Sequence, residues 1–191
     1  VAIGLVADLA VLVGDVRYYV QQGLRALRAT TRPGLRALLD LAGLEARSVD
    51  EGTIGFQIGP RLNAAGRLDD ACLGVRLLLT SDVTEATAIA QQLEVINAER
   101  QARTDALTAV VEAQLRASSE LLSAPAIVLE GENWEGGVLG LVAGKLAHDY
   151  GKPVVLIAHA EGRDSTASAR SVPGIDVHAA IASQRALLVR E

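Results

Sequence analysis

The segment from Gly59 to Arg67 combines two arginines and an amide with small residues, a pattern that packing alone does not require. Arginine binds phosphate oxygens through paired, charge-assisted hydrogen bonds, and small residues let a backbone approach a ligand closely. We therefore predict that Arg61 and Arg67 hold phosphate groups, while Asn63 bonds a backbone or sugar group. A helix cap with arginines on the surface is the alternative that these residues leave open.

Two further groups of residues suited to binding an anion lie nearer the end of the chain. Ser168, Arg170 and Ser171 place hydroxyl groups around one guanidinium, so we predict that they bind phosphate or a strand end. The glycine-rich segment 136–140 follows a predicted strand and opens a predicted helix, so the backbone of Gly137 is expected to face an anion. The plainer alternatives are the end of a strand and the tight packing of a helix on a sheet.

Asp8 is the one acidic residue in the apolar run 1–12. A carboxylate buried in such a run needs a partner or a metal ion, so a metal ligand and a helix cap are both open interpretations of Asp8 at this point. The three histidines, His148, His159 and His178, lack metal-ligand spacing and are expected at the surface. No nucleophile is paired with a histidine, which argues against covalent catalysis.

The composition narrows the class of protein. Half of the 191 residues are hydrophobic and 21% are charged, which predicts a folded chain with a core of its own. The net charge of -5 argues against a generally basic DNA-coating protein, so a nucleic-acid site must be local. A single cysteine, Cys72, cannot form an intrachain disulfide and favours a reducing cytoplasm. The apolar runs are too short to span a membrane, and no signal peptide is recognised.

Apolar periodicity predicts a mostly helical first part. Helices are expected over 17–27, 33–41 and 71–79, and a further short helix is expected to end near Gly59 and Pro60, because the residue before proline disfavours helical backbone. Asp82, with Glu85 three residues later, is expected to cap a long helix over 83–122, which contains no Gly or Pro. A helical hairpin broken near residues 102–105 is the alternative.

After Pro125 the pattern changes to a strand over 126–129, a helix over 138–150 and a strand over 153–158, which predicts a βαβ unit. Gly151 is expected to end the helix in a left-handed conformation. A further strand over 163–170 and a final helix over 177–189 follow. Trp134 is expected to form a half-buried lid over the core, with base stacking as the alternative. The predicted fold class is α/β, with a mostly helical part (1–80), a connecting helix (81–122) and a small α/β domain (123–191).

Four motifs, taken in order, resemble those of the DHH phosphoesterases, and among them the exonucleases specific for single-stranded DNA. They are the segments 4–8, 59–67, 134–140 and 168–171. The resemblance implies that residues 1–80 end a DHH domain that includes the GPRLNAAGR motif, and that residues 123–191 form a substrate-binding DHH-associated domain. It also implies that Asp8 is the last aspartate ligand of a centre holding two Mn²⁺ or Mg²⁺ ions. The phosphate-binding positions that it implies are Arg61, Asn63, Arg67, Ser168 and Arg170.

Two residues depart from the family pattern. Glu135 stands where a histidine is often found, and Ala167 stands where a glycine often precedes Ser-x-Arg-Ser. A carboxylate cannot donate a hydrogen bond as histidine does, so a substrate contact at Glu135 is not expected.

The resemblance implies a parent protein that hydrolyses single-stranded DNA from the 5′ end in DNA repair and recombination, with a single-strand-binding protein or a helicase as partner. We expect this chain to be a piece of it, because the sequence has no methionine and starts within an apolar run. The piece is expected to be nearly inactive alone, because one carboxylate cannot hold two divalent ions. Two alternatives are a DHH-family phosphodiesterase for short oligonucleotides or cyclic dinucleotides, and a non-catalytic nucleic-acid-binding scaffold. The absence of a Gly-Gly-Gly-His turn argues against the first, and the second would lack upstream metal ligands.

Overall fold

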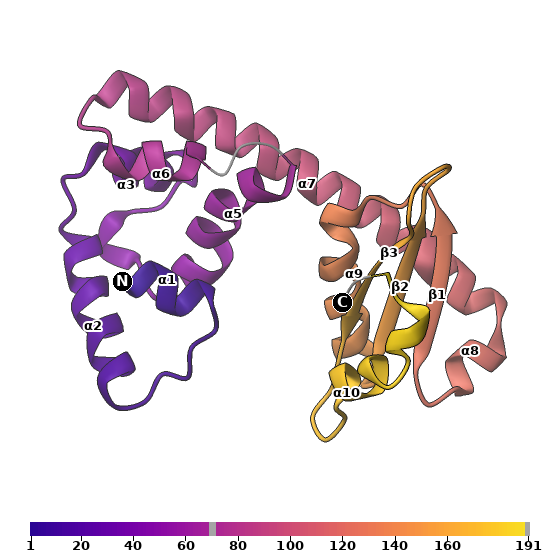
Figure 1. Cartoon of the computed structure of the whole chain (residues 1–191). Helices are drawn as coiled ribbons and strands as arrows, with labels where there is room; N and C mark the ends of the chain where they lie inside the picture. Colours follow the sequence, from indigo (N-terminus) through magenta and orange to yellow (C-terminus); the bar gives the residue numbers. More distant parts are fainter. Residues whose placement is uncertain (69–71, 190–191) are drawn as a thin grey trace. The chain divides into compact units, whose positions relative to one another are not determined.

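A computed structural model describes residues 1–68 and 72–189, except for the side chains of residues 67 and 68 (Figure 1). The chain divides into two compact units, Val1–Arg100 and Gln101–Glu191, which are described separately below. In the part of the chain covered by these ranges, no helix has both the length and the hydropathy needed to cross a membrane.

The first unit is helical, as expected. It contains α1 (Ala2–Ala7), α2 (Gly14–Arg28), α3 (Pro33–Leu41), a 3₁₀ turn η1 (Ala46–Ser48), α4 (Glu51–Thr53), a π-helical segment η2 (Ile54–Ile58), α5 (Gly59–Leu68), α6 (Cys72–Leu79) and the first part of α7 (Val83–Ala117). The helices predicted over 17–27, 33–41 and 71–79 correspond to α2, α3 and α6.

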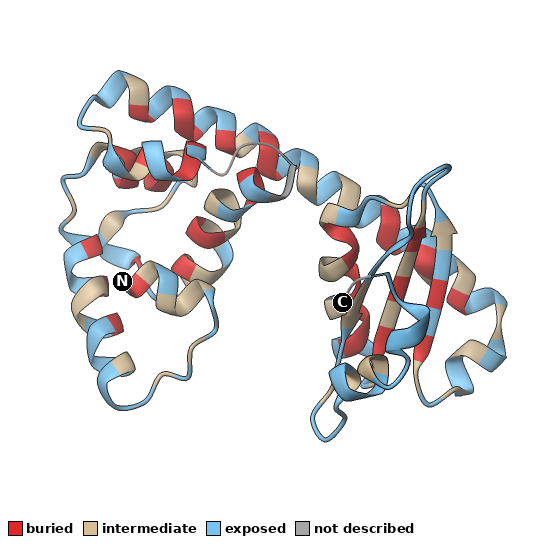
Figure 2. Cartoon of the chain, viewed as in Figure 1, coloured by how far each residue is buried: buried red, intermediate tan, exposed pale blue. Residues whose placement is uncertain are grey.

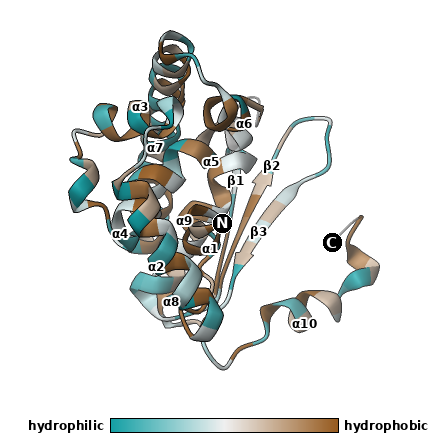
Figure 3. Cartoon of the chain, turned by 90° about the vertical axis from the view of Figure 1, so that its left-hand side faces the viewer, coloured by the Kyte–Doolittle hydropathy of each residue, from teal (hydrophilic) through white to brown (hydrophobic). Residues whose placement is uncertain are grey.

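Apolar faces of several helices build the core of the first unit. In α2 the buried residues are Val20, Leu24 and Leu27, whose spacing of four and three places them on one side of the helix. Figure 3 shows the corresponding change between hydrophobic and hydrophilic residues along α2. They pack with buried residues of α3, α6 and α7, including Leu38, Leu77 and Leu93. This core fixes the elements on which Asp8 and Arg61 lie.

The prediction that a helix ends near Gly59 and Pro60 is wrong, because the backbone stays helical from η2 into α5. The N–H of Gly59 bonds the carbonyl of Ile54, a longer-range pairing that widens the turn. Pro60 follows this wide turn directly, and the turn accommodates a residue that has no N–H to donate. A β-carbon at Gly59 would lie 3.0 Å from the Ile54 carbonyl oxygen, so the wide turn favours glycine.

The residues around α7 confirm the predicted cap and the unbroken helix. Asp82 accepts a hydrogen bond from the backbone N–H of Glu85 at 2.8 Å, as expected for a capping pair. The helix runs through residues 102–105 without a break, so the hairpin alternative is excluded. It ends at Ala117 instead of residue 122, because Ser118 caps a separate short helix, α8 (Ser119–Ser123).

The second unit contains the predicted βαβ arrangement. It comprises the rest of α7, α8, β1 (Ile127–Glu132), α9 (Gly136–Tyr150), β2 (Val154–His159), β3 (Thr166–Arg170), α10 (Val177–Ala182) and a 3₁₀ turn η3 (Arg185–Leu187). Strands β1 and β2 are parallel and connected through α9, and β3 pairs antiparallel with β2, giving the order β1-β2-β3. Gly151 ends α9 in the left-handed conformation, as expected. The final helix, α10, ends at Ala182 and is therefore shorter than the predicted helix over 177–189.

The core of the second unit lies on one face of the sheet. Alternate residues of β1 and β2 are buried, including Ile127, Leu129, Val154 and Leu156, and they pack with α9 and the end of α7. Strand β3 has no fully buried residue and lies at the edge of the sheet (Figure 2). The chain therefore has the predicted α/β fold, with polar side chains on an accessible edge strand.

Candidate nucleic-acid-binding site

Strand β3 lies against a row of glycines on α9. A β-carbon at Gly136 would lie 3.7 Å from Oγ1 of Thr166, and one at Gly140 would lie 3.0 Å from Oγ of Ser168. Four residues of a helix rise about 6 Å, and two residues of a strand rise about 6.6 Å. When a helix and a strand run in the same direction, every fourth helix residue therefore lies beside every second strand residue. Every second side chain of β3 therefore lies against the glycine face of α9, and the approach is closest at Gly140.

Arg170 continues this row. Its Nη2 would lie 3.0 Å from a β-carbon at Gly140, and its Nε would lie 3.9 Å from one at Gly144. Within the described residues, the guanidinium makes one hydrogen bond, from Nη1 to the Ala169 carbonyl, and no ion pair. An exposed guanidinium without a carboxylate partner is suited to binding an anion. The structure thus brings Ser168 and Arg170 together, and we call the row Thr166, Ser168 and Arg170, with the glycine face of α9, the β3–α9 surface.

Ser171 has a different position. Its hydroxyl donates to the carbonyl of Ile175 and, at 3.4 Å, to that of Val172. These bonds close the turn around Pro173 and Gly174, in which Gly174 has a positive φ of 87°. Ser171 therefore stabilises the turn after β3, and its hydroxyl is occupied by main-chain acceptors.

Gly137 lies in the first turn of α9, directly after Glu135 and Gly136. Glu135 is the N-cap residue, but its side chain makes no capping hydrogen bond and instead accepts from Nη1 of Arg103 on α7. Trp134 is half-buried, and a β-carbon at Gly131 would lie 2.2 Å from its ring. The predicted role of Trp134 as a lid over the core is confirmed.

Arg61, predicted from the sequence to hold phosphate, is largely buried and bonded within the first unit. Its Nε donates to Glu94 at 2.5 Å, its Nη2 donates to the same carboxylate at 3.3 Å, and its Nη1 donates to the carbonyl and side chain of Gln57. The side chain is 12% exposed. These bonds occupy most of the guanidinium donors, so Arg61 joins α5 to α7. Local sequence could not show this, because Glu94 lies 33 residues away.

The other two residues of this motif are only partly described. Asn63 is exposed on α5, where its amide is accessible to solvent. Arg67 lies in the last turn of α5, and its side chain falls outside the described residues.

Asp8 is exposed, so the prediction of a buried carboxylate is wrong. The apolar run forms only the short helix α1, and Asp8 is its C-cap, followed by Leu9 with a positive φ of 55°. Carbonyl groups at a helix C-terminus carry partial negative charge, which favours a cation beside this carboxylate. Among the described residues, however, no three His, Cys, Asp or Glu side chains cluster as a metal site would require. Asp8 can thus supply one metal ligand, and the described residues do not complete a two-metal centre.

The end of α1 lies beside the start of α5 in the first unit. A β-carbon at Gly59 would lie 3.5 Å from Cβ of Ala7, the residue before Asp8. The structure therefore brings the predicted metal ligand next to the beginning of the GPRLNAAGR motif.

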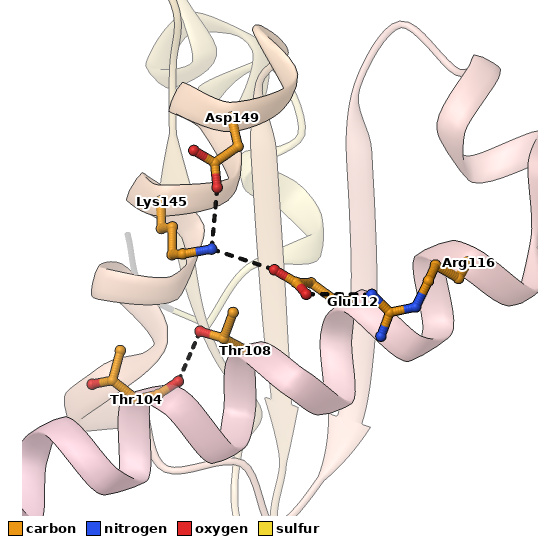
Figure 4. A network of polar contacts seen from close by, with 6 residues as sticks. All are labelled: Thr104, Thr108, Glu112, Arg116, Lys145 and Asp149. Atoms are coloured by element: carbon orange, nitrogen blue, oxygen red, sulfur yellow. Dashed lines mark hydrogen bonds and ion pairs between the residues drawn. The ribbon is translucent and has the colours of Figure 1, made fainter.

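Both lysines have partners that stabilise the second unit. Lys145 on α9 bonds Asp149 at 3.1 Å and Glu112 of α7 at 3.3 Å (Figure 4). Hydrogen bonds to Asp149 and then Glu112 raise the pKa of Lys145 above its ordinary value. Lys152 donates to the carbonyls of Leu122 and Ala124 near the end of α8. Neither lysine belongs to the β3–α9 surface.

The histidines are at the surface, as expected, but His159 has partners that were not predicted. Its Nδ1 lies 2.8 Å from Oγ of Ser165, and its Nε2 lies 3.2 Å from Glu130. All three side chains are accessible to solvent, and His159 is held at the end of β2. His148 and His178 are exposed.

A cavity of about 390 Å³ lies elsewhere in the first unit. It is lined by Arg28, Arg36, Arg47, Asp40, Glu45 and three apolar residues, Leu39, Leu44 and Ala46. None of the predicted site residues lines it, and its three guanidinium groups are opposed by two carboxylates.

Sequence reasoning missed Thr166 and Arg103. The pattern Thr-Ala-Ser-Ala-Arg over 166–170 places a polar residue at every second position, and this period of two could have added Thr166 to the set. Arg103 offers no such signal, because its partner Glu135 lies 32 residues away.

Comparisons with known proteins find the same family that the sequence motifs resemble. Residues 123–187 match the DHHA1 domain family. The single-stranded-DNA-specific exonuclease RecJ of Bacillus subtilis is 36% identical over 188 residues, covering 98% of this chain and 24% of the relative. RecJ of Escherichia coli is 35% identical over 187 residues, covering 95% of this chain and 32% of the relative. The chain therefore spans about a quarter to a third of the length of these curated relatives.

Solved structures give the same result. The crystal structure of Thermus thermophilus RecJ in complex with Mn²⁺ matches with a TM-score of 0.85 and 35% identity, over 99% of this chain and 27% of that one. A structure of exonuclease RecJ bound to manganese matches with a TM-score of 0.77 and 34% identity, over 99% of this chain and 46% of that one. The chain thus carries a DHHA1 domain at residues 123–187 and is, over nearly its whole length, homologous to a segment of RecJ.

Proposed function

We propose that this chain is the phosphate-binding part of a metal-dependent exonuclease that degrades single-stranded DNA from the 5′ end. The observation that carries the proposal is the position of Arg170, whose guanidinium lies on Gly140 beside Ser168 without a carboxylate partner among the described residues. The names of the relatives, which are exonucleases specific for single-stranded DNA, support the choice of substrate.

The β3–α9 surface has the chemistry that a DNA strand requires. Arg170 offers a charge-assisted donor to a phosphate oxygen, and the hydroxyls of Ser168 and Thr166 donate to neighbouring phosphate or sugar oxygens. All three side chains come from one face of a single strand, so their order along the strand is fixed. Because none of them reads a base edge, binding through this surface is expected to be independent of sequence.

Asp8 is proposed as one ligand of a two-ion Mn²⁺ or Mg²⁺ centre whose other ligands lie outside these 191 residues. The proposal is supported by the metal-bound RecJ structures to which the chain is similar. When bound, such ions activate water for attack on the phosphodiester. One exposed carboxylate does not hold two divalent ions, so this chain by itself is expected to bind DNA without cleaving it.

The cellular role is a further part of the proposal. We place the parent enzyme in DNA repair and recombination in the cytoplasm, with single-stranded DNA as substrate and a single-strand-binding protein or a helicase as partner. The single cysteine supports a reducing compartment.

The test is to incubate this chain with Mn²⁺ and fluorescently labelled single-stranded DNA and to follow binding and cleavage together. Binding without appreciable cleavage is the expected result, and robust turnover would contradict the proposal that the metal centre is incomplete in this chain. The same assay with a dinucleotide tests the alternative of a small-substrate phosphodiesterase. That alternative requires the dinucleotide to bind at least as tightly as a long strand.

A further inference from the structure

The N-cap residue of α9 carries a carboxylate that does not cap the helix. Glu135 is the N-cap residue, yet its side chain accepts no hydrogen bond from the N–H groups of the first turn. It instead accepts a hydrogen bond from Nη1 of Arg103 on α7. An acidic side chain at this position would ordinarily be attracted to the positive end of the helix. Arg103 therefore bonds this carboxylate in place of the N–H groups of the first turn.

Glu135 is also adjacent to the β3–α9 surface. The next residue, Gly136, is the first glycine of the row on α9, and a β-carbon there would lie 3.7 Å from Oγ1 of Thr166. A negative charge beside this surface repels a DNA phosphate, and placing like charges together costs binding free energy. The ion pair with Arg103 neutralises that charge.

We propose that Arg103 is a positioning residue that keeps Glu135 paired and away from the N-terminus of α9, so that the β3–α9 surface can accept phosphate. This inference rests on the proposed function, because it concerns the affinity of the same surface for DNA. It predicts that the harm done by removing Arg103 comes from the unpaired Glu135 carboxylate, which then turns toward the helix terminus and competes with phosphate.

The simplest rival explanation is that Arg103 contacts DNA directly. Both explanations predict weaker binding when Arg103 is removed, but they differ in how that loss depends on Glu135. A direct contact is lost whether or not residue 135 is charged. If Arg103 acts only by positioning Glu135, removing Arg103 no longer weakens binding once the Glu135 carboxylate is replaced by an amide of the same shape.

A double-mutant cycle separates the two. The affinity of the chain for a labelled oligothymidine is measured by fluorescence anisotropy at fixed salt for the unmodified chain, Arg103→Ala, Glu135→Gln and the double variant. We expect Arg103→Ala to weaken binding about tenfold, or about 1.4 kcal/mol, in the unmodified chain and less than about twofold in the Glu135→Gln background. Equal losses in both backgrounds would overturn the inference in favour of direct contact.

Two controls complete the experiment. Arg116→Ala removes another arginine of α7 that is paired with a glutamate, Glu112, and is expected to change affinity far less than Arg103→Ala. Thermal unfolding of each variant shows whether it is folded, and Arg103→Gln replaces Arg103→Ala if the alanine variant is not. Arg170→Ala reports on the proposed function separately. If it leaves affinity unchanged, the β3–α9 surface does not bind DNA, and the inference about Arg103 falls with it.

Discussion

A β-carbon on Gly140 would lie 3.0 Å from Nη2 of Arg170, so any larger residue there requires the guanidinium to shift by a few tenths of an ångström. One turn further along α9, a β-carbon on Gly144 would lie 3.9 Å from Nε of the same arginine, an ordinary contact distance. The two glycines therefore have different roles, although both face Arg170.

The substitution Gly140→Ala is expected to displace the ends of Arg170 and Ser168 and to weaken binding of single-stranded DNA about tenfold, the loss of roughly one charge-assisted contact. The matched control is Gly144→Ala, which should leave affinity unchanged and stabilise the helix by about 0.5–1 kcal/mol. Fluorescence anisotropy and urea unfolding of both variants make the comparison. Equal affinities for the two variants would show that the position of Arg170 does not matter for binding.

Arg61→Ala is expected to reduce the free energy of unfolding by about 1–3 kcal/mol, because Glu94 and Gln57 lose a charged hydrogen-bond partner. Arg61→Lys should restore little of this stability, since an ammonium group cannot reproduce the paired bonds of the guanidinium. Urea unfolding of both variants, with Asn63→Ala as an exposed control on the same helix, measures the effect. A fully stable Arg61→Ala variant with lost DNA affinity would instead support the phosphate-binding role predicted from the sequence.

Helix α3 packs closely on α6 at Gly34, where a β-carbon would lie 1.9 Å from the carbonyl oxygen of Leu77. Gly34→Ala must push the two backbones apart, and we expect it to destabilise the first unit by about 1–3 kcal/mol. Gly4→Ala is the control, because a β-carbon there meets no atom within 4 Å. Thermal unfolding should separate the two variants, and an unchanged midpoint for Gly34→Ala would contradict the described packing.

The pKa of Glu85 is lowered by a hydrogen bond from the hydroxyl of Thr80 and, next, by one from Arg76. Because the folded-state pKa lies below the unfolded one, this stabilisation is present above the ordinary carboxyl pKa and is lost as the pH falls through the lowered value. Glu85→Gln should therefore make the unfolding free energy less dependent on pH between about 5 and 2. Glu120→Gln, at an exposed position on α8, is the control, and equal pH profiles for both variants would refute the role of Thr80.

The sequence was sufficient for the elements that depend on local chemistry. The period of apolar residues, the Asp82 cap and the left-handed Gly151 predicted α2, α7 and the end of α9, since each signal involves neighbours along the chain. The helix break at Gly59 was predicted wrongly because the π-type turn of η2 accommodates Pro60.

The sequence predicted some residues of the candidate site correctly and others only in part. Ser168 and Arg170 were found because they are two residues apart on one strand and share a face. The ion pair of Arg61 was not predicted because its partner Glu94 comes from another helix, and Asp8 was wrongly expected to be buried because an apolar run need not be buried. A contact between distant parts of the chain decided the outcome for Arg61, and residue type alone does not report it.

The central claim is that the β3–α9 surface binds the phosphates of single-stranded DNA through Arg170. The most direct measurement is the affinity of this chain for a labelled oligothymidine as a function of salt concentration, for the unmodified chain, Arg170→Ala and the control Arg116→Ala. We expect Arg170→Ala to weaken binding and to reduce the slope of log affinity against log salt by about 0.7, the value for one phosphate contact on a single strand, while the control leaves both nearly unchanged. An Arg170→Ala variant with the affinity and salt dependence of the unmodified chain would contradict the claim.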